Sequence, residues 1–302
     1  MCLISHSIFN KVFGRKTDPP LDTLDLRGTH YEAYIDKVKS GMAMLRALPW
    51  KKIYMEGVNG DKLAAYYYDC GADKTVIMCH GYRSHYFSNA AAPGVYFKNA
   101  GYNLLMLVLR GHEESEGKYI SFGELESKDL LLWIDKAVND LGCKKLVLYG
   151  VSLGSNTVMR ASEFINAPEV KALVCDCGFI NTMSSIKMNV KNRCNNLPKK
   201  LLFPILAIPL IGGMRLWGRR LGGFDIFSGD TRKSVANNKL PMFFIHGAKD
   251  IVVPLSATKA NFEACKADKD IYIAKEAGHG CGFLAGGEKL KDKLDSFLGK
   301  YI

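Results

Sequence analysis

This sequence has few features that would let the protein cross or enter a membrane. No stretch reaches the roughly 20 uninterrupted apolar residues that a membrane-spanning helix needs. The N-terminal stretch MCLISHSIFNKVFGRK has no charged region ahead of its apolar part and no small-residue cleavage site. We therefore expect no secretory signal. A short amphipathic anchor over residues 3–13 is an open alternative.

The sequence also lacks the motifs of nucleic-acid and metal binding. It contains no helix-turn-helix, zinc-finger or RNA-binding aromatic signature. The nine cysteines are an odd, scattered set, and Cys79 and Cys175 fall within predicted buried strands. Cys175 and Cys177 lack the CxxC spacing that is typical of a metal site, so metal binding is not expected. We expect reduced thiols in the cytoplasm, with no metal, no cofactor and no nucleic-acid partner.

The net charge of the chain bears on its solubility and on the partners it could attract. Among 302 residues, 41 are Lys or Arg and 30 are Asp or Glu, which gives a formal charge of +11. A basic surface keeps a protein soluble, and it also attracts acidic partners such as anionic lipid. The composition, with 48% hydrophobic and 24% charged residues, is that of an ordinary globular protein. The length fits one large α/β domain with an insertion, or two small domains.

Strands and helices alternate along most of the chain. A linker is predicted over 17–21, a helix over 29–48, and a hairpin whose strands, 51–56 and 63–69, flank an Asn-Gly turn. Further strands are predicted over 75–79, 102–109, 145–149, 170–175, 241–245 and 270–274, and further helices over 88–99, 122–141, 255–265 and 287–298. This alternation indicates an α/β fold with a mostly parallel sheet covered on both faces and the hairpin at an antiparallel edge.

One segment interrupts the alternation. Residues 179–239 contain the apolar run LLFPILAIPLIGGMRLW, whose prolines and glycines prevent one long helix. Because the segment lies between two predicted strands, it must leave the sheet and return. We interpret it as a helical cap over the site, and the alternative is a set of helices packed on the sheet edge. The predicted organisation is an extension with a helix over 1–50, a core over 51–178 and 240–302, and this cap.

The stretch from Lys144 to Arg160 carries the strongest functional signal. An apolar run over 145–149 favours a buried strand, and the motif GVSLG at 150–154 follows it, ahead of a small-residue helical pattern. Strand, Gly-x-Ser-x-Gly, helix is the context of a nucleophile elbow, a strained turn that lifts a serine hydroxyl above the sheet. Only glycine lets the two backbone arms pass close beside that serine. Ser152 is therefore the predicted nucleophile.

A serine nucleophile needs a base within hydrogen-bond reach and an acid that orients the base. In a parallel sheet, loops after later strands supply them in the order Ser, Asp, His. Asp250 follows the strand that ends at 245, and His279 follows the strand that ends near 274. Both would lie on the same rim of the sheet as Ser152. Asp176, which comes directly after the strand that follows the elbow, is the alternative acid.

The oxyanion that forms during acyl transfer needs N–H donors. One is predicted to be the backbone N–H of Leu153, at the N-terminus of the helix after the elbow. The other would come from the loop after the first core strand, where Gly81 lets the backbone turn inward. We assign it to the N–H of Tyr82. His80 is expected to be structural.

Six short motifs together resemble the serine hydrolases of the α/β-hydrolase superfamily. They are HGY at 80–82, RGHEESEG at 110–117, GVSLG at 150–154, DCG at 176–178, HGAKDIVVP at 246–254 and AGHG at 277–280. From the predicted hairpin onward, the sequence is most similar to the bacterial YqkD-like and Bem46-like hydrolases. The resemblance implies the α/β-hydrolase fold and a catalytic triad of Ser152, Asp250 and His279. It also implies Tyr82 and Leu153 as the oxyanion donors.

Two positions depart from a pattern common in that superfamily, Asp-x-Arg-Gly-His-Gly-x-Ser. Val108 stands in place of the Asp, and Glu113 stands in place of the second Gly. The loop should lie near the site but outside the triad. The departures therefore bear on the conformation of this loop and leave the triad intact.

These residues predict a serine hydrolase that cleaves a carboxylic ester of a small-molecule substrate without a cofactor. The same triad can cleave peptides or amides, or pass the acyl group to an acceptor other than water. A non-catalytic binding protein on a hydrolase scaffold is a further alternative. The insertion is apolar, so it could admit lipid esters, and basic residues lie around it. Through the insertion or the N-terminus, the protein could also make weak contact with an anionic membrane surface.

Overall fold

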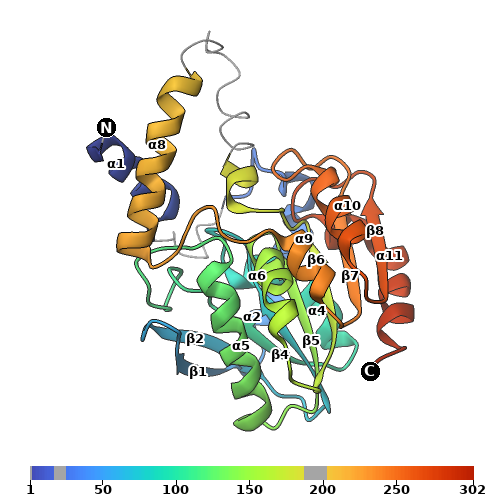
Figure 1. Cartoon of the computed structure of the whole chain (residues 1–302). Helices are drawn as coiled ribbons and strands as arrows, with labels where there is room; N and C mark the ends of the chain where they lie inside the picture. Colours follow the sequence, from blue (N-terminus) through green and yellow to red (C-terminus); the bar gives the residue numbers. More distant parts are fainter. Residues whose placement is uncertain (1, 17–24, 187–202) are drawn as a thin grey trace.

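An eight-stranded sheet runs through the computed structural model (Figure 1), which describes residues 2–16, 25–186 and 203–302. The strand order is β1-β2-β4-β3-β5-β6-β7-β8. The strands are β1 (Lys51–Glu56), β2 (Lys62–Tyr68), β3 (Lys74–Cys79), β4 (Asn103–Leu107), β5 (Lys145–Val151), β6 (Val170–Asp176), β7 (Met242–Gly247) and β8 (Lys269–Ala274). β1 and β2 pair antiparallel, β2 pairs antiparallel with β4, and the pairs from β4 to β8 are parallel. The predicted mostly parallel sheet with an antiparallel hairpin at its edge is confirmed.

Burial explains the composition of the strands. Every residue of β4 and β7 is buried, as expected for parallel strands that helices cover on both faces. In β1 only Ile53 is buried, because this strand lies at the edge of the sheet. The hairpin turn between β1 and β2 includes Gly60, whose φ is 79°, a value that glycine adopts without strain.

Helices cover both faces of the sheet. One apolar layer contains residues of α5 (Glu124–Asn139), α6 (Leu153–Ala161), α9 (Thr231–Asn237) and α10 (Leu255–Ala264). The other contains residues of α2 (Ile35–Arg46), α3 (Tyr86–Ala90), α4 (Pro93–Asn99) and α11 (Gly282–Leu298). Hydrophobic burial on two faces of one sheet is therefore what holds the central part of the chain together.

Three predicted helices differ from the observed ones. The helix predicted over 88–99 is wrong as a single element, because Pro93 has no N–H to donate and starts a second helix, α4. The last helix begins at Gly282 and not at 287, with a break at Gly287, where φ is 55°. The helix predicted over 29–48 is a short 3-10 turn, Glu32–Tyr34, followed by α2. The linker predicted over 17–21 lies outside the described residues.

The N-terminal helix α1 (Cys2–Phe13) packs beside α8 (Phe203–Trp217), and the pair stands away from the sheet in Figure 1. Phe9 and Phe13 are completely buried, and their rings lie 5.0 Å apart. Protein therefore covers this part of the proposed amphipathic anchor, whereas Leu3 and Ile4 remain exposed. Within the described ranges, the structure has no helix both long and apolar enough to cross a bilayer.

The described parts of the insertion, 179–186 and 203–239, do not pack together as one unit. α9 packs against α6 and α10 and so belongs to a helical layer of the core. α8 packs against α1 instead. The packing of α9 matches the alternative of helices packed on the sheet. The cap over 179–239 stays a prediction.

Phe13→Ala should lower the free energy of unfolding by about 3–5 kcal/mol, because the ring is fully buried among Phe9, Phe122 and Phe224. Urea unfolding followed by circular dichroism measures the change. Leu3→Ala is the control, because Leu3 is 85% exposed and should shift the free energy by no more than about 0.5 kcal/mol. Equal effects of the two substitutions would show that α1 does not dock as described.

Asp176 should make stability fall as the pH rises. Burial raises its pKa from 3.8 to about 7, although Tyr149 donates a hydrogen bond to it. The folded state therefore holds a proton that the unfolded chain releases near pH 4, and this stabilising contribution is lost as the pH rises through 7. Relative to Asp176→Asn, the unfolding free energy of the wild type should fall by about 1–4 kcal/mol between pH 4 and 8. Parallel pH profiles of the two proteins would refute the raised pKa.

Candidate active site

The turn between β5 and α6 is held by close backbone packing. A Cβ at Gly154 would lie 2.0 Å from the carbonyl oxygen of Cys79 at the end of β3, and a Cβ at Gly150 would lie 2.2 Å from the carbonyl oxygen of Gly154. Both positions therefore require glycine. Ser152, between them, has a φ of 55°, a left-handed value that costs an L-residue free energy. This conformation is that of the predicted nucleophile elbow.

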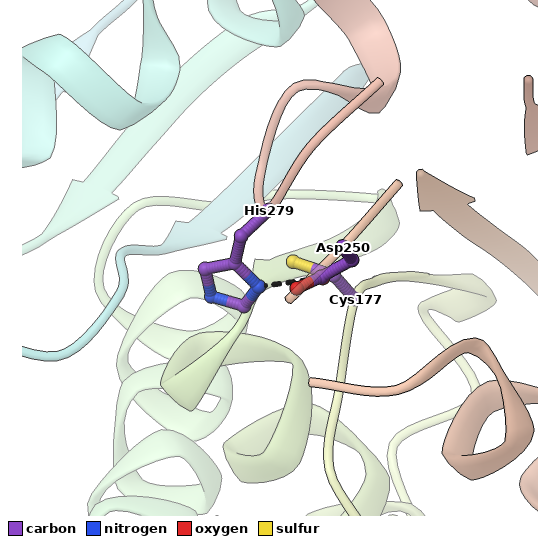
Figure 2. A group of neighbouring side chains, drawn as sticks. All are labelled: Cys177, Asp250 and His279. Carbon is purple, nitrogen blue, oxygen red and sulfur yellow. Dashed lines mark hydrogen bonds and ion pairs between the residues drawn. The ribbon is translucent and has the colours of Figure 1, made fainter. Parts of the chain in front are cut away.

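A chain of two hydrogen bonds links the three predicted triad residues. The Ser152 Oγ lies 2.8 Å from His279 Nε2, and His279 Nδ1 lies 2.7 Å from Asp250 Oδ2. The hydroxyl can donate to Nε2 only if the proton of the neutral imidazole is on Nδ1, where it is donated to the carboxylate. Figure 2 shows the imidazole facing the Asp250 carboxylate. The structure thus brings together residues that are 127 positions apart.

Backbone donors fix the orientation of Asp250. Its side chain is completely buried, and its Oδ1 accepts the N–H groups of Val252 and Val253, each at 2.8 Å. Burial acts to raise the pKa of Asp250, but the hydrogen bond and charge of His279, together with the N–H of Val253, outweigh it and lower the pKa. Asp250 is therefore ionised at neutral pH and can stabilise a positive charge on the imidazole.

His246 is a residue of the site for which the sequence suggested no role. It is fully buried, its Nε2 lies 3.0 Å from the carbonyl oxygen of Val253, and its Nδ1 lies 2.8 Å from the Thr258 hydroxyl. Burial lowers its pKa, which favours a neutral ring that donates from Nε2. His246 thereby ties both ends of the loop that carries Asp250. The signal was present in the sequence, since His246 stands four residues before Asp250.

Asp176, the alternative acid, has different partners. Its Oδ2 accepts a hydrogen bond from the Tyr149 hydroxyl at 3.2 Å, and its backbone carbonyl accepts the N–H of Ser152 at 2.8 Å. The imidazole N–H goes to Asp250 instead. The structure therefore places Asp176 beneath the elbow, where it supports the backbone of the turn.

The backbone on both sides of Tyr82 is held by side chains. The N–H of Gly81 donates to Asn89 Oδ1 at 2.6 Å, and the N–H of Arg83 donates to His112 Nε2 at 3.0 Å. The Tyr82 hydroxyl donates to the carbonyl oxygen of Val12 at 2.5 Å. Tyr82 lines the same cavity as Ser152. Its N–H and that of Leu153, the first residue of α6, remain the predicted oxyanion donors.

A cavity of about 300 Å³ opens over Ser152 and His279. Much of its wall comes from the N-terminal segment 25–31, which the sequence did not link to the site. The His30 ring lies edge-on to the His279 ring, with 5.7 Å between centroids. None of the described residues of 179–239 lines this cavity. The sequence did not reveal that residues 25–31 form part of the wall, because this depends on contact between distant segments, which no local pattern shows.

A thiol lies beside the acid and the base. Cys177 Sγ, Asp250 and His279 place their possible ligand atoms within 4.8 Å of one another (Figure 2). Thiolate, imidazole and carboxylate are groups that bind zinc. Here, however, the acid and the base are hydrogen-bonded to each other, so a metal ion would have to displace that bond.

Comparison with known proteins places these features in context. Residues 71–207 match the family described as serine aminopeptidase, S33. The YqkD protein of Bacillus subtilis (strain 168) is 24% identical over 229 residues, which cover 74% of this chain and 70% of YqkD.

Solved structures show the same fold. The esterase Pf2001 of Pyrococcus furiosus superposes with a TM-score of 0.67 at 21% identity, covering 84% of this chain and 93% of that one. The esterase EaEST from Exiguobacterium antarcticum superposes with a TM-score of 0.57 at 16% identity, covering 82% and 98%. The predicted α/β-hydrolase fold is confirmed.

Proposed function

We propose that this protein is a serine hydrolase that cleaves carboxylic esters through an acyl-enzyme. The observation that carries the proposal is the hydrogen-bond chain from Ser152 through His279 to Asp250 at the wall of a cavity. A serine hydroxyl alone is a poor nucleophile, and this arrangement supplies the base and the acid that it needs.

The first half of the reaction forms the acyl-enzyme. Ser152 Oγ attacks the carbonyl carbon while its proton passes to His279 Nε2, and Asp250 stabilises the resulting imidazolium. The carbonyl oxygen becomes an oxyanion, which the N–H groups of Tyr82 and Leu153 would hold. As the carbonyl re-forms, the bond to the leaving oxygen breaks, and that oxygen takes the proton from His279.

The second half releases the acid. A water molecule gives a proton to His279 Nε2 and attacks the acyl carbon. Collapse of this second intermediate breaks the bond to Ser152 Oγ, which takes the proton back. The sum is one ester and one water converted to one carboxylic acid and one alcohol, and the enzyme is regenerated without a cofactor.

The size of the cavity bears on the substrate. Ligand pockets commonly range from about 300 to 1,000 Å³, and this one is about 300 Å³. A volume at the lower end favours short esters over long acyl chains. The names of the two solved relatives, both esterases, support ester cleavage.

Amide or peptide cleavage is the second candidate. The family match over residues 71–207 carries the description serine aminopeptidase, and the same attack by Ser152 serves an amide if His279 protonates the leaving nitrogen. Matched p-nitrophenyl esters and p-nitroanilides of one short acyl group separate the two candidates by their relative kcat/KM.

A fluorophosphonate probe should label the wild-type protein on Ser152, because the probe reacts with a serine activated by a neighbouring base. Labelling should vanish in Ser152→Ala. The check is gel fluorescence followed by mass spectrometry of the labelled peptide. Folded wild-type protein that stays unlabelled, or label on another residue, would contradict the proposed nucleophile.

The two carboxylates should differ in their effect on activity. Asp250→Asn should lower kcat on a p-nitrophenyl ester by about 10³–10⁴-fold, because the imidazole loses its orienting acceptor. Asp176→Asn should stay within about tenfold of the wild type, because Asp250 accepts the imidazole N–H. Steady-state kinetics of both variants give the comparison, and the reverse order would make Asp176 the orienting acid.

A further inference from the structure

The helices α1 and α8 form a pair that runs side by side in the same direction. Gly213 of α8 packs against Ser5, and four residues further along α1 the Phe9 ring lies beside Gly218. The C-terminal end of α1 enters the core, where Phe13 is fully buried. The N-terminal end of α1 and the part of α8 beside it therefore form the free end of the pair, away from the sheet (Figure 1).

The free end of the helix pair exposes large apolar side chains. Leu3 and Ile4 of α1 are 85% and 58% exposed, and Ile208 of α8 is 74% exposed. α1 has no Lys, Arg, Asp or Glu before Lys11, and α8 has none before Arg215. Single exposed apolar residues are ordinary, but several at one uncharged end of a projecting element indicate a surface that binds a partner.

The exposed stripe of each helix changes from apolar to basic along its length. Residues at intervals of four lie on one face of a helix. On α8 and the π-helical turn η4 (Gly218–Gly222) that follows it, the exposed residues at this interval are Ile208, Gly212, Leu216 and Arg220. On α1 they are Leu3, Ser7 and Lys11. Because the helices run the same way, both apolar ends lie at the free end and both basic residues lie toward the core.

The net charge of the pair is strongly positive. Residues 2–16 and 203–222 contain no Asp or Glu and six Lys or Arg, which are Lys11, Arg15, Lys16, Arg215, Arg219 and Arg220. They account for +6 of the formal charge of +11. The carboxylate of Asp225 is shared by Arg215 and Arg219, so it neutralises only one of those two charges. The helix pair is therefore complementary to an acidic partner.

We propose that the free end of the helix pair docks on an anionic membrane surface. The apolar side chains would enter the boundary of the acyl chains, and the basic residues would lie at the level of the lipid phosphates. Leu3 and Lys11 are eight residues apart, which is about 12 Å along a helix, and interfacial helices bury their apolar face about 5–10 Å deep. This inference goes beyond the proposed function and does not depend on it.

A second copy of this chain is the other occupant that an apolar surface could have. In a symmetric dimer, the same face of both copies would meet. Two faces that each carry an excess of positive charge repel each other, whereas anionic lipid attracts both. The charge of the pair therefore favours the membrane surface over self-association.

The test is co-sedimentation of the full chain with lipid vesicles. One set of vesicles is phosphatidylcholine alone, and the other contains about 30% phosphatidylserine. The wild type should bind the anionic vesicles at least about tenfold more tightly, because each basic residue near such a surface contributes about 1 kcal/mol, or about fivefold. Added salt should weaken the binding, because it screens the charges.

Two double variants separate the apolar and the basic contributions. Leu3→Ser with Ile208→Ser should weaken binding by about tenfold or more, because both side chains lose their burial in lipid. Lys11→Gln with Arg220→Gln should weaken binding to the anionic vesicles by about 25-fold. Met44→Ser is the matched control, because Met44 is 51% exposed but belongs to α2, on the opposite face of the sheet. It should bind as the wild type does, and circular dichroism checks that each variant is folded.

Three results would overturn the docking surface while leaving the hydrolase proposal intact. One is wild-type binding that is no tighter to anionic than to neutral vesicles. Another is unchanged binding in both folded double variants. The third is a dimer, seen by analytical ultracentrifugation, that the Leu3→Ser and Ile208→Ser variant abolishes while the wild type binds no vesicles. That result would assign the free end to a second copy of the chain.

Discussion

The close approach of backbone at the elbow is the constraint on which the site depends. The first residues of α6 lie so near the end of β3 that a Cβ at Gly154 would fall 2.0 Å from the carbonyl oxygen of Cys79. The N–H of Ser152 is at the same time held by the carbonyl of Asp176 at the end of β6. The strained serine is thus fixed between two neighbours of β5 in the sheet, and no flexible loop has to position it.

The N-terminal segment is part of the site although it precedes the core in the chain. The carbonyl oxygens of Lys11, Val12 and Gly14 hold Arg83 and Tyr82, in the loop that carries a proposed oxyanion donor. Residues 25–31 then form part of the cavity wall. α1 packs against α8, and its Phe9 and Phe13 rings pack against Tyr119, Phe122 and Phe224, which anchors this arrangement. The geometry around Tyr82 therefore depends on contacts made far from the sheet.

Two buried carboxylates show how environment assigns roles. Asp250 accepts two backbone N–H groups and the imidazole, and its pKa is lowered. Asp176 lies at the same rim of the sheet, but its side chain accepts from the neutral hydroxyl of Tyr149, and burial raises its pKa to about 7. Only the first is a stable anion at neutral pH. Hydrogen-bond donors, more than position along the chain, thus separate the two acids.

The sequence by itself determined the strand order along the chain, the glycines of the elbow, and a histidine and an acid placed after later strands, because each leaves a local pattern. It left Asp176 and Asp250 both open, and it gave no role to His246 or to residues 25–31. Only the tertiary structure decided these points, because they depend on contacts between segments far apart in the chain. The left-handed φ of Glu113 belongs with them, since the loop contacts of Arg15 and Arg110 hold it.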